Sequence, residues 1–220
     1  MSTSLVELSH VSKTYNDGNV IALSDVSLAI HPAEFVAIVG PSGCGKSTLL
    51  NLLGALDRPS EGLVSFEGET THNAAQLDRL RSQKIGFVFQ SFYLLPNLTA
   101  EENVQLPMFE SSLGPPQRTQ RARELLEDVG LSERRRHLPN QLSIGQRQRV
   151  AIARALANSP ELILADEPTG SLDSKSGAEV MDLLASLNDK QSTALVVVTH
   201  DDRVAALARR CIRMLDGRIL

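Results

Sequence analysis

Tryptophan is absent from this sequence of 220 residues, and cysteine and tyrosine occur only twice each. Two cysteines, Cys44 and Cys211, cannot form a disulfide framework. No apolar run approaches the roughly 18 residues that a membrane-spanning helix needs. The first residues carry no basic-then-apolar leader, so we expect a cytoplasmic protein. The formal net charge of −4 provides no basic surface, so we expect no nucleic-acid partner.

The most informative stretch runs from Gly40 to Thr48 and reads GPSGCGKST, which fits the phosphate-binding pattern G-x-x-x-x-G-K-[ST] without a mismatch. The apolar run Phe35–Val39 before it predicts a buried strand. The leucines between Leu49 and Leu56 after it predict a helix with a broad apolar face. A Gly-rich turn that binds nothing is the alternative, but the strand–loop–helix context is the one that a phosphate loop requires. We therefore expect nucleotide phosphates to bind at this loop.

The residue types of the loop explain how it would hold phosphate. Glycines bring backbone N–H groups close to phosphate oxygens, where a Cβ would obstruct them. The start of the following helix presents free N–H groups and a positive dipole end. Lys46 supplies charge for the β- and γ-phosphates, and the Ser47 hydroxyl can be a ligand of Mg²⁺. The expected nucleotide contacts are Gly40, Pro41, Ser42, Gly43, Cys44, Gly45, Lys46, Ser47 and Thr48.

Three further apolar runs end in polar residues that suit a hydrolytic site, because ligands of open α/β sheets bind off the carboxyl ends of the strands. Asp166 would hold Mg²⁺ through water, and Glu167 would orient or deprotonate an attacking water. Taken singly, Gln90 is also consistent with an ordinary strand end, and a strand-end histidine such as His200 is more often structural; beside a phosphate loop they predict a nucleotide hydrolase. The runs and their terminal residues are Ile85–Phe89 with Gln90, Leu162–Ala165 with Asp166 and Glu167, and Ala194–Val198 with His200.

The N-terminal segment has a different pattern and predicts an antiparallel unit. Leu5–Val11 and Val20–Ile30 are its two expected strands, with turn residues at Asn16–Asn19 between them. Leu63–Phe66 is a further short strand. Tyr15 lies just before the turn and, by itself, is most simply a half-buried strand aromatic.

From Ser91 to Pro160 the sequence changes to helices and loops. Capping-box spacing places helix starts at Thr99 and Ser143. Gln117–Val129 predicts an amphipathic helix that is closed by a glycine, and Arg134–Arg136 predicts a solvated face. We expect this part of the chain to form a helical subdomain inserted into the α/β core.

The core resumes after this insertion. We expect a helix over about Ser176–Leu187, an alanine-rich helix after His200, and a hairpin over Met214–Ile219 on an Asp-Gly turn. The predicted division is therefore a single domain over 1–220. Within it, 1–90 and 160–220 form an α/β core with the antiparallel unit, and 91–159 form the helical subdomain.

Taken in order, these motifs resemble those of the ATP-binding subunits of ABC transporters, over nearly all of the chain. The resemblance implies a P-loop NTPase core of mostly parallel sheet flanked by helices, an antiparallel β-subdomain and a helical signature subdomain. It also implies ATP and Mg²⁺ as cofactors. The implied catalytic residues are Glu167, His200 and Lys46, and the implied metal ligands are Ser47, Gln90 and Asp166.

The same resemblance assigns further nucleotide contacts. Tyr15 matches the aromatic residue that stacks on adenine, and Gln90 matches the Q-loop glutamine that also senses the membrane partner. Residues 142–146 stand where the family has its LSGGQ signature, from which Ser143, Gly145 and Gln146 would contact ATP. Asp173 matches the D-loop aspartate.

The signature departs from the family pattern at Ile144, which replaces the first of two glycines. The resemblance assigns the γ-phosphate contacts mainly to Ser143 and Gly145, and both are present. The helix start can therefore still present N–H groups to phosphate. A β-branched residue there can crowd the opposing nucleotide, so hydrolysis is expected to be affected more than binding.

The resemblance also implies the assembly. One phosphate-loop site is open on one side, and the signature helix of a second copy closes it, so ATP lies between two chains in head-to-tail arrangement with Asp173 at the seam. Since this chain carries one set of motifs, we expect a homodimer that separates after hydrolysis. We also expect a separate integral-membrane permease, which would keep the dimer on the cytoplasmic face of the inner membrane.

Several segments narrow the resemblance to a bacterial subgroup of lipoprotein-release, macrolide-export and peptide-antibiotic-resistance ATPases, some of which work with a periplasmic adaptor. The cell-division ATPase is similar too, so an ATP-driven regulatory module that signals through a membrane partner is an alternative to transport. A soluble ABC ATPase of DNA repair or translation is disfavoured, because the sequence shows no coiled coil, second cassette or basic surface. The subgroup segments are Leu53–Pro59, Phe92–Thr99, Glu102–Val104 and Ala165–Asp173.

Overall fold

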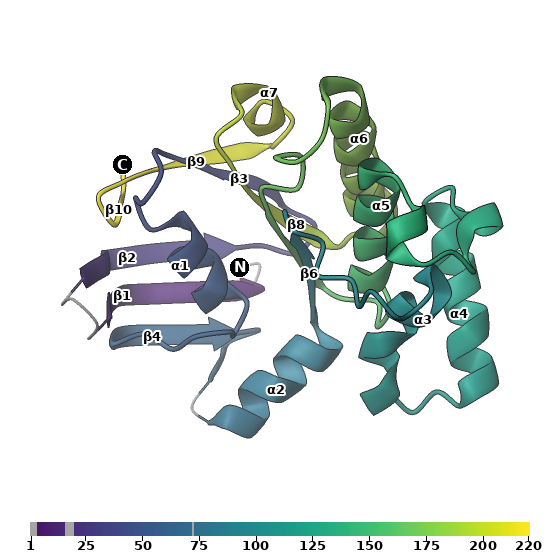
Figure 1. Cartoon of the computed structure of the whole chain (residues 1–220). Helices are drawn as coiled ribbons and strands as arrows, with labels where there is room; N and C mark the ends of the chain where they lie inside the picture. The colour runs from purple at the N-terminus through teal and green to yellow at the C-terminus, as the bar shows by residue number, and fades with distance from the viewer. Residues whose placement is uncertain (1–3, 16–19, 72) are drawn as a thin grey trace.

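Two β-sheets organise the molecule in the computed structural model, which describes residues 4–15, 20–71 and 73–220 (Figure 1). A four-stranded antiparallel sheet has the order β2-β1-β4-β5, and a six-stranded sheet has the order β10-β9-β3-β8-β7-β6. The first contains β1 (Val6–Tyr15), β2 (Val20–Ile30), β4 (Glu61–Phe66) and β5 (Glu69–Thr70). The second contains β3 (Phe35–Val39), β6 (Ile85–Phe89), β7 (Leu162–Asp166), β8 (Ala194–Thr199), β9 (Arg210–Leu215) and β10 (Arg218–Ile219).

The helices occupy the connections between these strands. The α-helices are α1 (Lys46–Leu53), α2 (Ala74–Gln83), α3 (Ala100–Gln105), α4 (Pro115–Asp128), α5 (Ile144–Ala155), α6 (Ser174–Gln191) and α7 (Asp202–Ala205). Short 3₁₀ turns cover Leu106–Glu110, Ser132–Arg134 and Pro139–Gln141. In the described part of the chain, none of these helices has both the length and the apolarity to cross a bilayer.

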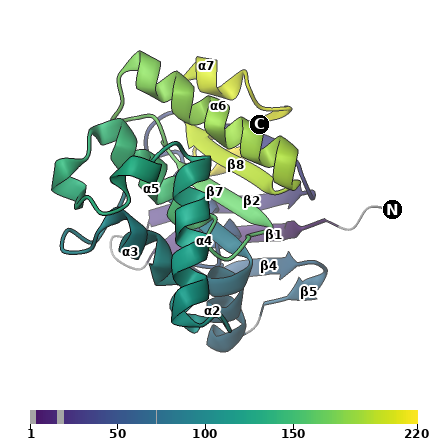
Figure 2. The ribbon, with the colours of Figure 1, turned by 90° about the vertical axis from the view of Figure 1, so that its right-hand side faces the viewer.

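Within the six-stranded sheet, the parallel strands β3, β6, β7 and β8 are largely buried on both faces, as their unbroken apolar runs predict. Along β7, Ile163 and Ala165 pack on one face and Leu162 and Leu164 on the other, because successive side chains point to opposite sides of a strand. The first face lies against α5 and α6, and α3 and α4 pack on α5 within the same apolar cluster; Figure 2 shows these helices together on one side of the parallel strands. The second face lies against α1 and the antiparallel sheet. The helices after β6 therefore share one apolar core with the sheet.

The antiparallel sheet forms as predicted. β1 and β2 pair from Val6 opposite Ile30 to Tyr15 opposite Val20. The predicted turn at 16–19 lies outside the described residues. The α/β fold class, with a mostly parallel sheet and an antiparallel β-subdomain, is confirmed.

The C-terminal hairpin joins both sheets to the loop after β3. Asp216 and Gly217 both have positive φ angles, 46° and 76°, as a two-residue hairpin turn of this hand requires. Gly217 N donates to Cys44 O over 3.1 Å, and Ser24 N donates to Gly217 O over 2.9 Å. The hairpin was predicted; that its first strand begins at Arg210 and runs parallel to β3 was not.

Three local expectations need correction. The helix after the phosphate loop ends at Leu53, so Leu56 lies beyond it and is 45% exposed rather than part of its apolar face. The alanine-rich helix after His200 is only the four residues of α7. Helix α2 was not predicted at all, because Leu77 is its only buried side chain and its apolar pattern is correspondingly weak.

Candidate active site

The loop between β3 and α1 has the close backbone approaches that its glycines allow. Gly45 caps α1 with φ 101°, a left-handed conformation that disfavours other residues. A Cβ on Gly45 would also clash with the carbonyl oxygen of Ala22, and one on Gly40 would clash with that of Met214. At Gly40 and Gly45 the loop therefore lies so close to β2 and the C-terminal hairpin that only hydrogen fits in place of a side chain.

Lys46 shows how the loop fits a phosphate. Its Nζ donates to Gly40 O over 2.8 Å and to Pro41 O over 2.9 Å, so the ammonium group lies over the loop. The first turn of α1 contains no acidic residue. The positive end of the helix and the ammonium group therefore face the same concave backbone, and a chain of phosphates fits between them.

The polar strand ends meet at one edge of the parallel sheet. Phe89 of β6 pairs with Asp166 of β7, and Asp166 pairs with Val198 of β8. On the other side of β8, Val39 of β3 pairs with Thr199. Since these four strands are parallel and adjacent, the residues that follow them lie side by side with the phosphate loop. They are Gln90, Glu167, His200 and Gly40.

Asp166 is the carboxylate best placed for a cation. Burial raises the pKa of Asp166, the nearby charge of Glu167 raises it further, and Lys46 lowers it. A divalent cation would remove this destabilisation of the charged form. Hard oxygen ligands suit Mg²⁺, and Ser47, Gln90 and Asp166 supply a hydroxyl, an amide and a carboxylate. The residues present therefore fit the predicted metal.

Glu167 directly contacts His200. The two side chains approach to 2.7 Å between Glu167 Oε1 and His200 Nδ1, with Glu167 18% and His200 74% exposed. The hydrogen bond with Glu167, together with its negative charge, raises the pKa of His200. Glu167 has φ 46° and is held by its N–H, which donates to Val198 O over 2.9 Å. A left-handed backbone at a non-glycine residue is a strain that often accompanies function.

Gln90 lies against the loop that follows Glu167. A Cβ on Gly170 would come within 2.8 Å of Gln90 Nε2, and Gly170 N donates to Glu167 O over 3.0 Å. Further along, Asp173 caps α6 by accepting from Lys175 N and Ser176 N. These hydrogen bonds, that from Ser176 N first, lower the pKa of Asp173. The predicted Q-loop and D-loop residues thus flank the Glu167 loop.

The signature residues begin α5, away from the phosphate loop. Ser143 and Gln146 form the predicted capping box, with bonds of 3.0 and 3.2 Å. A Cβ on Gly145 would lie 3.5 Å from that of Ser176 in the first turn of α6, and Ile144 is 44% exposed. Among the described residues, no hydrogen bond joins this motif to Lys46. Helices α1 and α5 also pack on opposite faces of the parallel strands, so one chain does not bring its signature residues onto its own phosphate loop.

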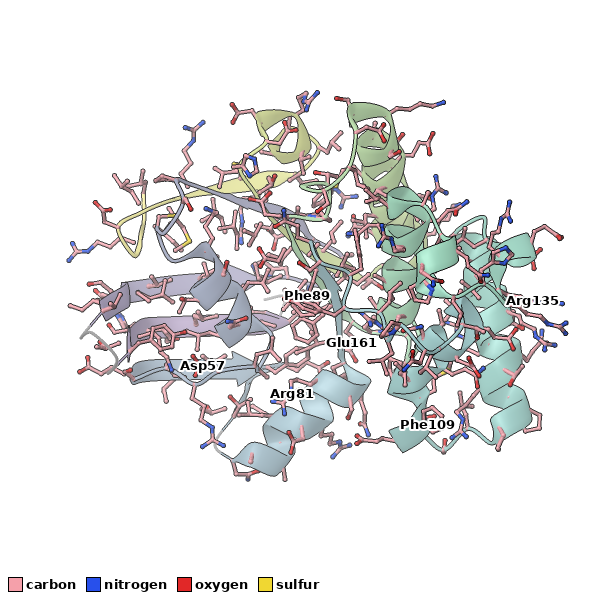
Figure 3. All side chains as sticks on the ribbon, viewed as in Figure 1. Asp57, Arg81, Phe89, Phe109, Arg135 and Glu161 are labelled. Carbon is pink, nitrogen blue, oxygen red and sulfur yellow. The ribbon has the colours of Figure 1, made fainter. Side chains whose placement is uncertain are left out.

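The Tyr15 side chain contacts Lys13 of β1 and Asp57 of the loop before β4. Its hydroxyl donates to Asp57 Oδ2 over 3.0 Å, and Lys13 Nζ lies 5.0 Å from its ring centroid. Lys13 also donates to Asp57 Oδ1 over 2.6 Å. Figure 3 shows Asp57 beside the antiparallel sheet, far from Phe109 and Arg135 on the helical side. The adenine-stacking role of Tyr15 stays a prediction.

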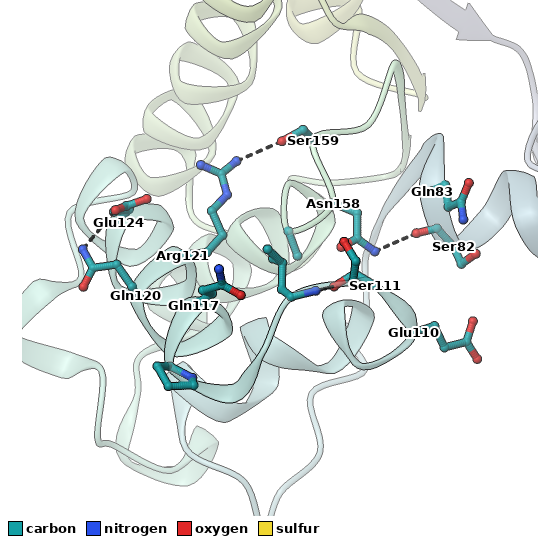
Figure 4. Close-up of a pocket in the computed structure, with 14 residues that line it drawn as sticks. Ser82, Gln83, Glu110, Ser111, Gln117, Gln120, Arg121, Glu124, Asn158 and Ser159 are labelled. Atoms are coloured by element: carbon teal, nitrogen blue, oxygen red, sulfur yellow. Dashed lines mark hydrogen bonds between the residues drawn. The ribbon is translucent and has the colours of Figure 1, made fainter.

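Two pockets differ in their relation to these residues. One of about 390 Å³ is lined by Glu167, His200 and Asp173. A larger one of about 780 Å³ lies between the end of α2, the start of α4 and the end of α5 (Figure 4). Its lining, which includes Arg121 and Asn158, contains none of the predicted site residues. The larger pocket is therefore separate from the chemistry.

Sequence reasoning missed three residues at this site. Asp57 anchors Tyr15, Gly170 makes room for Gln90, and Gln148 of α5 donates to the carbonyl oxygen of Pro168 over 2.8 Å. Gln148 had a weak signal, because Ala151 and Ile152, three and four residues later on the helix predicted to start at Ser143, are apolar and share its face. Asp57 and Gly170 had no such signal, because their contacts with Tyr15 and Gln90 join segments that are far apart in the sequence.

Comparison with known proteins places these features in a family. A family model described as "ABC transporter" matches residues 23–170, which is more than half of the chain. YknY, an uncharacterized ABC transporter ATP-binding protein of Bacillus subtilis, is 47% identical over 220 residues, with 98% of this chain and 95% of YknY covered. The macrolide export ATP-binding/permease protein MacB of Wolinella succinogenes is 50% identical over 223 residues, and this chain spans 34% of its length.

Solved structures are similar as well. The ATP-binding cassette MJ0796, which is also a curated protein of Methanocaldococcus jannaschii, has a dimeric structure of a post-hydrolysis state bound to ADP and Pi. It matches with 49% identity and a TM-score of 0.89 over 97% of this chain and 96% of that one. The cbiO1 protein of Clostridium perfringens matches with 27% identity and a TM-score of 0.90 over 99% and 87%. The family resemblance predicted from the motifs is confirmed.

Proposed function

This chain belongs to the ABC transporter family of ATP-binding proteins, and we propose that two copies clamp two ATP molecules between them and use hydrolysis to drive a membrane permease. The observation that carries the proposal is the contact between Glu167 and His200 at the sheet edge that also holds Asp166 and the phosphate loop. A nucleophile-activating carboxylate beside a phosphate site is what hydrolysis of a phosphoanhydride requires.

The residues divide the work at this edge. Lys46 and the loop N–H groups would bind the phosphates, and Ser47, Asp166 and Gln90 would hold Mg²⁺. The bound Mg²⁺ supplies positive charge against the developing charge of the transferred phosphoryl group. Glu167 would accept the proton of the attacking water, and His200, fixed by Glu167, would contact the γ-phosphate.

The signature residues would complete the site of a second copy. Ser143, Gly145 and Gln146 begin α5 at a distance from their own phosphate loop, and the start of α5 is a ready site for phosphate. In a head-to-tail pair each α5 faces the partner's nucleotide, and Asp173 lies at the seam. The dimeric structure of the similar cassette MJ0796 supports this arrangement.

The membrane side of the proposal rests on relatives and on one surface. MacB carries an ATP-binding part and a permease in one chain, by its name. We place this chain on the cytoplasmic face of the inner membrane beside a permease for lipoprotein or lipid release, or for drug or peptide export. A cytoplasmic segment of that permease would dock in the pocket of about 370 Å³ lined by Phe89 and Tyr93, since Tyr93 is 65% exposed three residues after Gln90.

Purification from detergent-solubilised membranes tests this proposal. The tagged chain should recover an integral membrane protein, and Tyr93→Asp should lose it while still binding ATP. Co-purification of cell-division proteins with that membrane protein would favour the regulatory alternative. Recovery of ribosomes or DNA without any integral membrane protein would contradict the proposal.

A further inference from the structure

Gln148 connects the signature helix to the loop that carries the hydrolytic carboxylate. It lies on α5, three residues after Gly145, and its side chain is completely buried. Its Nε2 donates to the carbonyl oxygen of Pro168 over 2.8 Å, and Pro168 directly follows Glu167. One side chain thus spans from the helix that starts at Ser143 to the residue next to the proposed general base.

Packing alone does not explain an amide at this position. Gln148 Oε1 is buried and has no hydrogen-bond partner within the described ranges. A buried, unpaired acceptor is unfavourable, whereas methionine would fill nearly the same volume without that penalty. The donating half of the amide is therefore the part that the protein uses.

The loop that contains Glu167 and Gly170 requires contacts with neighbouring segments to keep its conformation. Glu167 has a left-handed backbone, which persists only when its surroundings fix it. On the sheet side, Glu167 N donates to Val198 O, and within the loop Gly170 N donates to Glu167 O. From the helical side, the bond of Gln148 with Pro168 holds the loop against α5.

We propose that Gln148 is a positioning residue, which holds Pro168 so that Glu167 is aimed at the attacking water while the loop stays attached to the signature helix. The proposal rests on the proposed function. In that function Ser143 and Gly145, at the start of α5, contact the nucleotide bound by the partner. The hydrogen bond of Gln148 would therefore connect Glu167 of one site to the helix that contacts the nucleotide of the other site. Loss of the bond should therefore lower turnover and leave ATP binding and pairing intact.

Two substitutions of Gln148 and one control separate positioning from stability. Gln148→Met keeps the volume and removes the donor, whereas Gln148→Glu restores a donor only when the carboxyl group is protonated. Asn188→Leu is the control, because Asn188 is another buried amide that donates to backbone carbonyls, those of Ala33 and Thr193, far from the site. Thermal unfolding of all three variants checks that they fold.

Steady-state ATPase measurements separate an effect on kcat from an effect on ATP binding. Gln148→Met should lower kcat about tenfold or more with the half-saturating ATP concentration changed less than about twofold, and Asn188→Leu should keep the parental kcat. Burial raises the pKa of a carboxyl group, so the kcat of Gln148→Glu relative to the parent should rise as the pH is lowered from 8 to 6. If the role of Gln148 is purely structural, the pH profiles of kcat for Gln148→Glu and for the parent should run parallel.

Three results would overturn the proposal: a parental kcat in Gln148→Met, a Gln148→Glu profile parallel to that of the parent, or loss of ATP-dependent pairing in folded Gln148→Met/Glu167→Gln. The last would assign Gln148 to the dimer seam instead. Failure of Glu167→Gln alone to pair with ATP would refute the proposed function itself, so the two failures are distinguishable.

Discussion

His200 Nδ1 lies 2.7 Å from Glu167 Oε1, and this contact joins the ends of the neighbouring strands β8 and β7. The carboxylate favours the protonated imidazole, which raises the pKa of His200 above its usual 6.5. The ion pair is therefore complete below pH 6.5 and is lost as the pH rises through the raised value.

Titration by NMR tests this pair, because the chain has only five histidines. His200 should titrate above 6.5 in the parent and move back towards that value in Glu167→Gln. The exposed His10, which faces Asp25 instead, is the internal control. An unchanged His200 titration in the variant would show that the contact does not persist in solution.

Removing the charge of Lys46 should weaken ATP binding. Hydrogen bonds to charged groups contribute about 1.5–3 kcal/mol, so Lys46→Ala should raise the Kd for ATP roughly ten- to a hundredfold. Titration with a fluorescent ATP analogue measures this change. Lys190→Ala, which removes an exposed lysine at the end of α6, should bind as the parent does. Equal affinities for the two variants would contradict the phosphate-loop assignment.

The anchoring of Tyr15 by Asp57 should matter for adenine binding. Tyr15→Ala removes the ring and should weaken ATP binding up to about tenfold, the scale of an aromatic stacking contact. Tyr15→Phe and Asp57→Ala each remove the 3.0 Å hydrogen bond but keep the ring, and should weaken binding a few-fold. The double variant should be no weaker than the weaker single one, because both remove the same bond. Fully additive losses would show that Asp57 does not act through Tyr15.

A methyl group at Gly170 should disturb Gln90. The added Cβ would lie 2.8 Å from Gln90 Nε2, and a flexible side chain can move away with little loss of stability. Gly170→Ala should therefore lower kcat about tenfold, with a small change in melting temperature. Gly177→Ala is the matched control, since its Cβ would make only an ordinary 3.5 Å contact with Thr169. It should preserve kcat and stabilise α6 by up to about 1 kcal/mol. Similar kcat values for both variants would argue against a role for the position of Gln90.

The sequence predicted the elements whose signals are local. The strand Phe35–Val39 and the helix starts at Thr99 and Ser143 lie where their apolar runs and capping boxes place them. Helix α2 has a capping box of its own, Asn73 with Gln76, but only Leu77 is buried, so no broad apolar face marks it. Strand β9 has a local signal, since Ile212 and Met214 alternate with exposed residues, but its parallel pairing with β3 joins distant segments that no local pattern relates.

The difference between local signals and long-range contacts also applies to the candidate active site. Motif residues such as Lys46 and Glu167 were found because spacing and strand ends identify them. The contacts of Asp57 and Gln148 join segments 42 and 20 residues apart, and folding alone brings these together. That Tyr15 is held by Asp57 likewise could not be predicted from the order of motifs.

The central claim is that ATP joins two copies of this chain and that cleavage lets them separate. Glu167→Gln should still bind ATP while losing about two to three orders of magnitude in turnover, the scale of a key transition-state group. In sedimentation at saturating ATP with Mg²⁺, this variant should run as a dimer, and with ADP as a monomer. A variant that stays monomeric with ATP, both alone and beside its membrane partner, would contradict the account.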